Sequence, residues 1–333
     1  MEPVTPTLPD DDVAAIDRLG AIYKELSSEL SKMIIGQQRV VELLSIALFS
    51  RGHALLMGVP GLAKTLLVSS VAKTLDLSFN RIQFTPDLMP ADITGTDIIQ
   101  DDSAGGKRQF EFIKGPVFAN IVLADEINRT SPKTQSALLE VMEEQQVTVD
   151  GVTHPVPQPF IVLATQNPGE FVGTYPLPEA QMDRFFLRLS IGYPTIEQEM
   201  DVLERYSGVV KPMATLSPVC SAADVIAMQE MVTQIYCSPE VRSYVATIAA
   251  ATRQDAALQL GASTRAAIAL IHGAQACALL AGRDYIVPED VQHMAVQVLA
   301  HRLVLSPEAR MKGVTPESVV RRIIQNTPVP VKL

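Results

Sequence analysis

Short apolar runs alternate with stretches of helical periodicity over the first half of the chain. The runs lie at 53–57, 81–84, 121–124, 160–164 and 185–190. Between them, residues 64–75 and 132–144 have helical character, and Ser131 followed by Pro132 is a typical helix start. Unbroken apolar strands separated by helices are typical of a parallel sheet covered on both faces. We therefore predict an α/β domain with a parallel sheet.

Two segments interrupt this alternation. Residues 145–153 alternate in polarity around Asp150-Gly151, which is the strongest short-range hairpin signal. Residues 94–116 contain a pair of glycines between two apolar stretches, and could form a longer hairpin or a loop. Insertions of this kind are often functional, although a plain surface elaboration fits the pattern equally well.

The pattern changes at Tyr193-Pro194, after which we predict no further strand. Thr195 and Gln198 have the spacing of a capping box ahead of a helix that runs to about 205. Further helices are expected over 222–235, 239–252, 264–280, 288–301 and 316–324. At the other end, residues 1–12 look like a loose tail, followed by helices over 13–33 and up to about 50. The predicted units are a tail and helix (1–33), an α/β domain (34–193) and an all-α domain (194–333).

Composition is typical of a globular protein: 47% of the 333 residues are hydrophobic and 19% are charged. The net charge of −10 argues against a mainly electrostatic nucleic-acid binder, although a local basic channel could still exist. Three cysteines fit neither a disulfide framework nor a zinc site, so we expect buried, reduced thiols. No signal peptide is evident, and residues 266–280 are too short and interrupted for a membrane span. We therefore expect a cytoplasmic protein.

Residues 53–65 are predicted to form a strand, a tight turn and the start of a helix. Backbone N–H groups that converge at a helix N-terminus bind phosphate, and Gly58 and Gly61 let the backbone approach it closely. Lys64 would reach the β- and γ-phosphates, and the Thr65 hydroxyl would ligate Mg²⁺. Ala63 occupies a position that is glycine in the general pattern, and we expect it to keep a negative φ.

Two other predicted strands end in polar side chains. The run at 121–124 is followed by Asp125 and Glu126, and the run at 160–164 leads to Asn167. Because strand carboxyl ends line the ligand crevice in a parallel sheet, these groups should lie beside the phosphates. Asp125 can hold the Mg²⁺ shell and Glu126 can polarise the attacking water. Asn167 is placed to orient that water or contact the γ-phosphate. Taken alone, each could be an ordinary strand end or turn residue.

Two arginines complete the candidate site. Arg184 directly precedes the run at 185–190, and Arg265 lies in the first turn of the predicted helix over 264–280. A cation there opposes the helix dipole, so an anion such as phosphate should compensate it. Each arginine alone could equally be a solvated surface residue. The five histidines form no zinc motif, and nothing in the sequence supports covalent catalysis.

Five motifs follow one another in an order that resembles a AAA+ ATPase of the MoxR family, in the helix-2-insert clade. They are 58–65, 124–129, Asn167, 177–185 and 261–265. The resemblance covers essentially the whole chain after the tail, and alanine at position 63 is a variant found in that family. It implies a P-loop AAA+ core with a parallel five-stranded sheet (34–193) and an all-α lid domain (194–333). It also implies ATP, Mg²⁺ and hexameric rings, with ATP bound between one subunit's two domains and its neighbour.

The resemblance also implies a role for each matching residue. Lys64 and Thr65 match the Walker A lysine and Mg²⁺ ligand, Asp125 and Glu126 match Walker B, and Asn167 matches sensor 1. Arg184 is similar to the arginine finger that enters the neighbour's site, and Arg265 to the sensor 2 arginine of the lid. The implied nucleotide-binding set is Ile35, Gly36, Gly58, Pro60, Gly61, Leu62, Ala63, Lys64, Thr65, Leu66 and Arg265. Segments 94–116 and 147–153 are similar to the helix-2 insert and the pre-sensor-1 hairpin, which face the central pore in related motors.

The leading hypothesis is an ATP-driven chaperone that remodels or matures a partner complex. The resemblance implies a partner with a von Willebrand factor A domain, supplied by another chain. A nucleic-acid-stimulated motor is an alternative with thin support from Lys107, Arg108 and Lys114, so nucleic acid is an unlikely partner. A chelatase motor subunit is a further alternative. A nucleotide switch without hydrolysis is disfavoured by Glu126.

Overall fold

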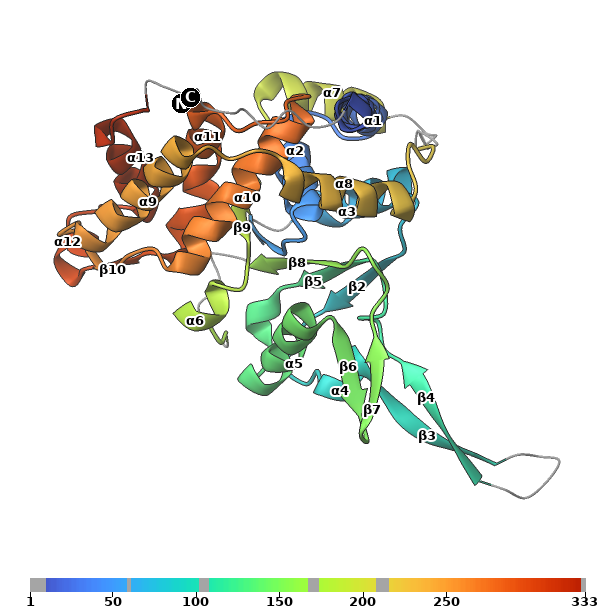
Figure 1. Cartoon of the computed structure of the whole chain (residues 1–333). Coiled ribbons are helices and arrows are strands. Elements are labelled where there is room, and N and C mark those ends of the chain that lie inside the picture. The colour runs from blue at the N-terminus through green and yellow to red at the C-terminus, as the bar shows by residue number, and fades with distance from the viewer. Residues whose placement is uncertain (1–9, 59–60, 102–107, 167–173, 208–215, 331–333) are drawn as a thin grey trace.

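A parallel sheet lies at the centre of the computed structural model, which describes residues 10–58, 61–101, 108–166, 174–207 and 216–330 (Figure 1). Its strands are β1 (Ala54–Met57), β2 (Phe79–Gln83), β5 (Ile121–Asp125), β8 (Ile161–Gln166) and β9 (Leu187–Ser190). Their order is β2-β5-β8-β1-β9, and every neighbouring pair is parallel. The predicted five-stranded parallel sheet is confirmed, and the carboxyl ends of β1, β5 and β8 meet at one edge.

The side chains of each strand alternate between two cores, one on each face of the sheet. Leu56 of β1 and Leu163 of β8 belong to a core that includes N-terminal, sheet-covering and lid helices. Leu55 and Ala164, which pair with each other across the same two strands, belong to the core on the opposite face. The central strands β1, β5 and β8 are therefore buried on both faces, which is why their sequences are nearly continuous apolar runs.

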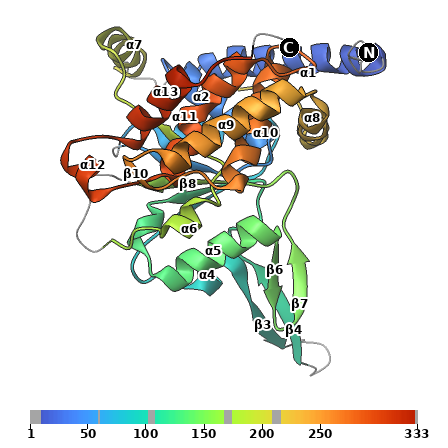
Figure 2. The same ribbon diagram turned by 60° about the vertical axis from the view of Figure 1, so that its left-hand side comes forward.

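The helices on the first face come from both ends of the chain (Figure 2). They are α1 (Asp10–Ser31), α2 (Gln38–Phe49), α3 (Lys64–Thr74), α8 (Ala222–Gln234), α9 (Pro239–Gln254), α10 (Thr264–Leu280), α11 (Pro288–Leu299) and α13 (Pro316–Asn326). Leu26 and Leu30 of α1 are fully buried among them. Helix α1 begins at Asp10, within the segment expected to be tail. The N-terminal helix is thus part of the main core.

Side-chain caps define where several helices begin. Ser263 accepts a hydrogen bond from the backbone N–H of Ala266 at 3.1 Å at the start of α10. Thr195 and Gln198 form the predicted capping box of α7 (Ile196–Tyr206). A serine or threonine oxygen at the N-cap satisfies an N–H group that has no partner inside the helix. These starts were predictable because the caps are local in sequence.

The second face carries α4 (Pro90–Thr94), α5 (Pro132–Glu144) and two hairpins, which extend away from the sheet (Figures 1 and 2). The hairpins are β3 (Gly95–Asp101) with β4 (Arg108–Lys114), and β6 (Gln146–Val149) with β7 (Val152–Pro155). Asp150 and Gly151 turn the second hairpin with φ of 48° and 81°, as an Asp-Gly turn predicts. The Phe112 ring stacks on the His154 ring at 4.0 Å between centroids, which joins the hairpins. Residues 94–116 therefore include a hairpin rather than only a loop.

The C-terminal part is helical, as expected, with one addition. A short antiparallel pair, β10 (Leu258–Leu260) and β11 (Val304–Leu305), was not predicted from the sequence. Short elements complete the fold: η1 (Ile127–Arg129), α6 (Glu179–Met182), η2 (Ala300–Arg302) and α12 (Pro307–Met311). Strands of two or three residues have too little periodicity to be recognised in a sequence. None of the helices in the described part of the chain has both the length and the apolar character needed to cross a membrane.

Candidate active site

The loop between β1 and α3 opens onto the carboxyl edge of the sheet. Gly61 has a φ of +88°, and Ala63, the N-cap of α3, has a φ of 51° and ψ of 30°. The expectation of a negative φ at Ala63 is therefore wrong. A left-handed conformation costs a non-glycine residue roughly 1–2 kcal/mol, because Cβ approaches the following carbonyl. With Ala63 in this conformation, the first turn of α3 lines a cavity at the edge of the sheet. Pro60 lies outside the described residues.

Lys64 lies at the first position of α3, and its Nζ donates a hydrogen bond to the carbonyl of Gly58. Partial burial lowers the pKa of Lys64, while the carboxylates of Asp125 and Glu126 oppose that shift. The lysine thus lies within electrostatic reach of both acids, as predicted from the motif order. Its ammonium group and the unpaired N–H groups of the first turn of α3 form a site for a polyanion.

Asp125 is held in place from two sides. Its Oδ1 accepts a hydrogen bond of 2.6 Å from the hydroxyl of Thr165 on β8. Its Oδ2 accepts bonds from Nε and Nη2 of Arg81 on β2, at 3.1 and 2.6 Å. Charge-assisted bonds of this length fix the orientation of the carboxylate. The side chain is 17% exposed, and it lines the cavity beside the phosphate loop.

Glu126 follows directly in a left-handed conformation, with a φ of 59°. Its backbone N–H donates to Thr165 Oγ1 at 2.8 Å, which fixes this turn to β8. Its Oε2 accepts a hydrogen bond from Gln83 Nε2 at 2.9 Å and lies 3.1 Å from Nη1 of Arg129. The strained backbone turns the carboxylate toward the same cavity that Asp125 lines. A carboxylate positioned in this way can accept a proton from a water molecule.

The sequence analysis missed three of these residues: Arg81, Gln83 and Thr165. Arg81 and Gln83 are two positions apart on β2 and therefore lie on the same face of that strand. Alternation alone could have shown that they share a face. Their approach to Asp125 and Glu126, however, depends on β2 pairing with β5, which a single sequence does not reveal.

Two adjoining cavities run along this edge. The polar one, about 440 Å³, is lined by Gly61, Leu62, Ala63, Lys64, Thr65, Arg81, Gln83, Asp125, Glu126 and Thr165. The other, about 260 Å³, shares the phosphate loop and is mostly apolar; Ile35, Leu66 and Val202 contribute to it. Gly36 has a φ of +72°, and the Gln198 side chain occupies the place of a Cβ. A polar cavity for phosphates beside an apolar one for a base matches the shape of a nucleotide. Asn167 lies outside the described residues.

The donor set of the polar cavity suits Mg²⁺. The Thr65 hydroxyl and the Asp125 carboxylate are hard oxygen donors in the same cavity. Mg²⁺ is commonly bound by one or two such groups, with phosphate and water completing its coordination. No cluster of three or more His, Cys, Asp or Glu side chains suited to a metal occurs in the described ranges. This donor set therefore fits a cation that arrives with phosphate.

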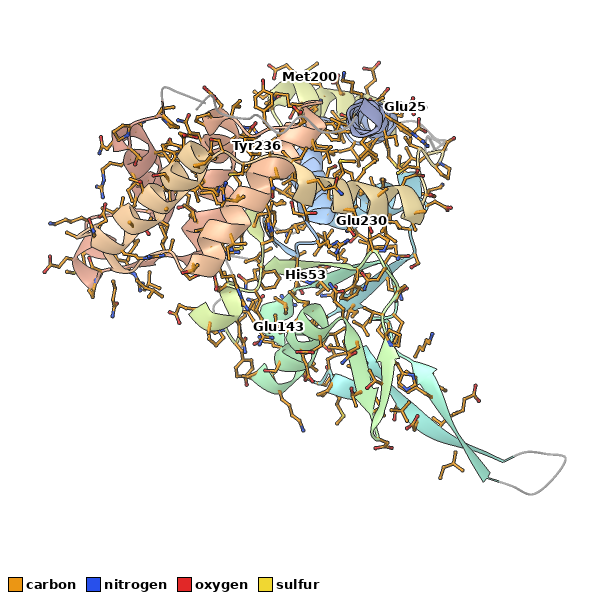
Figure 3. All side chains as sticks on the ribbon, viewed as in Figure 1. Glu25, His53, Glu143, Met200, Glu230 and Tyr236 are labelled. Carbon is orange, nitrogen blue, oxygen red and sulfur yellow. The ribbon has the colours of Figure 1, made fainter. Side chains whose placement is uncertain are left out.

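Arg184 and Arg265 meet at a different place, around Glu143 of α5. Figure 3 shows Glu143 close to His53, below the sheet. Arg184 Nη2 lies 2.9 Å from Glu143 Oε2, and Arg265 Nη2 lies 3.3 Å from Glu143 Oε1. Arg184 Nη1 also donates to the carbonyl of Leu139 at 2.8 Å. The two arginines line a cavity of about 140 Å³ with His53, and neither lines the cavity that contains Lys64. The carboxylate that compensates Arg265 at the start of α10 is Glu143.

His53 lies in the wall of the cavity that Arg184 and Arg265 line, and its ring is held by two hydrogen bonds. Its Nε2 donates to the carbonyl of Met142 at 3.0 Å, and its Nδ1 accepts from the backbone N–H of Val162 at 2.9 Å. Burial lowers the pKa of His53 to about 4, so the ring is neutral at physiological pH. The ring thus connects the end of α5, which carries Glu143, to the sheet.

The three cysteines are free, and Cys220 and Cys277 are buried. Burial raises the pKa of the Cys220 thiol to about 12. A thiol with so high a pKa carries almost no thiolate at neutral pH and is chemically inert.

Comparison with known proteins agrees with this geometry. Residues 53–187 match the model of the ATPase family associated with various cellular activities (AAA), and residues 250–323 match that of an AAA lid domain. A crystal structure from Cytophaga hutchinsonii, described as a presumed ATPase, superposes with a TM-score of 0.88. It is 41% identical and covers 95% of this chain and 97% of its own.

Two curated relatives span nearly the same length. Chaperone MoxR1 of Mycobacterium tuberculosis is 44% identical, over 91% of this chain and 81% of the relative. The uncharacterized protein YeaC of Bacillus subtilis is 47% identical, over 91% and 93%. Fold, cavity and matches together define a nucleotide-binding ATPase of the AAA class, with a lid domain. The chain belongs to the MoxR family of AAA+ ATPases.

Proposed function

We propose that this protein is an ATP-driven motor whose active site is completed by a neighbouring copy of the same chain, and that it remodels or matures a partner complex. One observation carries the proposal. Lys64, Asp125 and Glu126 line one cavity, whereas Arg184 and Arg265 line another. Arg184 and Arg265 therefore lie away from the cavity that Lys64 lines in their own chain. A second copy that brings its arginines to this cavity would complete the site.

Each residue has a defined part in the proposed reaction. Lys64 and the N-terminus of α3 bind the phosphates, and Thr65 with Asp125 holds Mg²⁺, which neutralises phosphate charge when bound. Glu126 accepts the proton of the attacking water. Arg184 of the neighbour stabilises the charge that develops on the transferred phosphoryl group. Asn167 is proposed to orient the water, and the apolar cavity that Ile35 lines accepts the adenine.

Arg265 is proposed to act beside Arg184 on the same neighbouring nucleotide. Their shared contact with Glu143 supports this reading. The domain boundaries proposed from the sequence separate a tail and helix from the α/β part near residue 34, and the α/β part from the lid near residue 194. These two arginines come from opposite sides of the second boundary. The angle between the domains would therefore influence how well both of them reach the phosphates.

An apolar row on α7 supports assembly. Ile196, Met200 and Leu203 are 76%, 64% and 62% exposed, and their spacing places them on one face of the helix. Val202 of the same helix lines the apolar nucleotide cavity, so the row lies next to the site that needs a neighbour. Exposed apolar rows of this kind are typical of protein interfaces. We propose a ring, with six copies when nucleotide is bound.

We further propose that the two hairpins transmit hydrolysis to a client. They extend from the sheet as a joined pair (Figure 2), so both follow movements of the α/β domain. The name of the relative MoxR1 states that it is a chaperone. A partner with a von Willebrand factor A domain and a cytoplasmic location complete the proposal, and the free cysteines suit a reducing compartment.

The test is ATP turnover per protomer, measured over a range of protein concentrations together with particle size. We expect turnover per protomer to rise steeply as copies assemble, because each isolated site lacks its arginines. A constant turnover per protomer, down to concentrations at which only single chains remain, would contradict the proposal. Stimulation is then compared for a protein with a von Willebrand factor A domain, single-stranded DNA, and a tetrapyrrole with Mg²⁺. Stimulation by DNA alone would favour the nucleic-acid motor, and metal insertion would favour a chelatase.

A further inference from the structure

Arg302 is an arginine of the lid whose side chain is only 3% exposed. Its Nη2 donates to the backbone carbonyls of Phe185 and Phe186, at 2.7 and 3.2 Å. Its Nη1 lies 3.4 Å from Oδ1 of Asp183. These partners lie on both sides of Arg184 in the chain. A single buried guanidinium from the lid thus holds the backbone that carries Arg184.

Two more lid residues contact the same segment. His301 Nε2 donates to the carbonyl of Phe185 at 3.0 Å, and burial lowers the pKa of His301 to about 3. The Ser263 hydroxyl lies 3.5 and 3.4 Å from the two carboxylate oxygens of Asp183. Ser263 is also the N-cap of α10, whose first turn carries Arg265. The side chain of Asp183, the residue before Arg184, is therefore hydrogen-bonded to the start of the helix that carries Arg265.

Burying a guanidinium is costly unless its charge and its donors are satisfied. Burial lowers the pKa of Arg302 to about 10, and the Asp183 carboxylate opposes that shift. Arg302 is therefore charged at neutral pH. Its Nη2 makes charge-assisted hydrogen bonds to two carbonyls. Within the described residues, its Nη1 makes no hydrogen bond and lies only at ion-pair distance from the Asp183 carboxylate. Such bonds hold position as well as charge, because the guanidinium is planar and its donors are fixed in direction.

We propose that Arg302 is a positioning residue that fixes segment 183–186 to the lid, so that Arg184 and Arg265 reach the neighbour's nucleotide as one unit. The proposal rests on the proposed action of Arg184 on a neighbouring copy. A movement of the lid then displaces both arginines together rather than one at a time. Arg302 itself touches no substrate, and its effect on turnover passes through the backbone beside Arg184.

The test compares Arg302→Gln, Arg302→Lys and Asp183→Asn in the full-length protein with Mg²⁺ and ATP. We expect Arg302→Gln to lower kcat per folded protomer about tenfold or more, because small misplacements of a catalytic group are costly. The dissociation constant for ATP should stay within about twofold, since Lys64 and its cavity are untouched. Arg302→Lys keeps the charge and should regain part of kcat. Asp183→Asn should lower kcat by a smaller factor.

Arg283 provides the matched control. It forms a two-bond ion pair with Asp290 inside the lid, at 2.7 and 2.9 Å, away from segment 183–186. Arg283→Gln should lower the thermal unfolding temperature yet leave kcat per folded protomer within about twofold. If the role of Arg302 is purely structural, Arg302→Gln and Arg283→Gln should both yield less folded protein, and the folded fraction of each should keep the parent kcat.

Each outcome decides between the two claims. If Arg302→Gln is folded and keeps kcat within about twofold of the parent protein, the positioning role is wrong. If Arg302→Gln does not fold, the same criterion applies to Asp183→Asn, whose side chain is a quarter exposed. Arg184→Ala is measured alongside. Full turnover of Arg184→Ala would overturn the proposed function itself, whereas its loss with unchanged Arg302 and Asp183 variants would overturn only this inference.

Discussion

The nucleotide cavity and the arginine pair are built in different ways. The cavity is formed by strand ends and a helix N-terminus, and its carboxylates are fixed by neighbouring strands, as the bonds of Thr165 and Arg81 to Asp125 show. The arginine pair consists of long side chains that share a carboxylate at the surface. Arg184 is 33% exposed and Arg265 is 57% exposed. The nucleotide cavity is already formed within one chain, whereas the two arginines carry their charge at the protein surface.

Under the proposed function, each region controls a different part of the reaction. A preformed cavity can bind nucleotide in a single chain, because its donors come from backbone and buried strands. Exposed arginines contribute little energy to their own fold, since surface ion pairs are typically worth 0–1 kcal/mol. They can contribute far more when they approach a phosphoryl group in a closed interface. Binding should therefore depend on the first region, and turnover on both.

The largest expected effect is that of Arg184→Ala. We expect ATP turnover to fall by about 10³–10⁵, which is the effect of an arginine finger in other NTPases, while ATP binding stays within about twofold. Measured turnover and equilibrium binding on the same preparation separate the two quantities. If ATP binding falls by the same factor as turnover, Arg184 acts in the nucleotide cavity of its own chain. The difference between the two regions would then not hold.

Glu126→Gln should have the next largest effect. Loss of a general base costs about 10²–10⁴ in rate, and the amide keeps the size of the side chain. The variant should bind ATP and accumulate as assembled rings, which size measurement with ATP will detect. In the same turnover assay, Arg184→Ala tests what the neighbouring copy contributes to hydrolysis. Glu126→Gln tests what the residues of the cavity itself contribute. Normal turnover of Glu126→Gln would remove that residue from the chemistry.

The pH dependence of stability tests the role of His53, which connects the end of α5 beside Glu143 to the sheet. Its pKa is about 4 in the folded protein and about 6.5 as the ordinary value, so the unfolded chain binds the extra proton first as pH falls. Stability should therefore decline between pH 6.5 and 4, by about 2 kcal/mol at pH 5 from this group alone. His53→Gln should remove this contribution, and leave that of His301, in denaturant titrations at several pH values. If His53→Gln and the parent protein lose stability in parallel between pH 6.5 and 4, His53 is not the titrating group.

The smallest expected effect is that of Ala63→Gly. Glycine relieves a left-handed strain of roughly 1–2 kcal/mol, but it costs about 0.5–1 kcal/mol in unfolded-state entropy. The net gain in unfolding free energy should therefore lie between about 0 and 1.5 kcal/mol, measured by denaturant titration. A clear loss of stability would mean that the positive φ of Ala63 is not strained.

Local patterns in the sequence predicted most elements of the fold. The run at 121–124, the Asp150-Gly151 turn and the Thr195 capping box each depend on neighbouring residues, and each is present in the structure. The phosphate loop was recognisable for the same reason. Its one error, the sign of φ at Ala63, arose because a residue type restricts backbone conformation without fixing it.

Features that depend on long-range pairing were not accessible from the sequence. The bond between Arg81 and Asp125 requires that β2 pairs with β5, and the order of strands is set by tertiary packing. The meeting of Arg184 and Arg265 on Glu143 joins three distant segments. Arg302 carried no recognisable motif, and only its burial against Phe185 reveals it. The sequence indicated candidate residues for the site, and the fold showed which of those in the described part of the chain share a cavity.

The most direct test of completion by a neighbour mixes two inactive proteins. Arg184→Ala retains an intact nucleotide cavity, and Glu126→Gln retains both arginines. In mixed assemblies, some Arg184→Ala cavities face an intact arginine pair, so ATP turnover should rise well above the sum of the separate proteins and depend on the mixing ratio. Turnover that equals that sum at every ratio, in particles shown to contain both variants, would contradict the account.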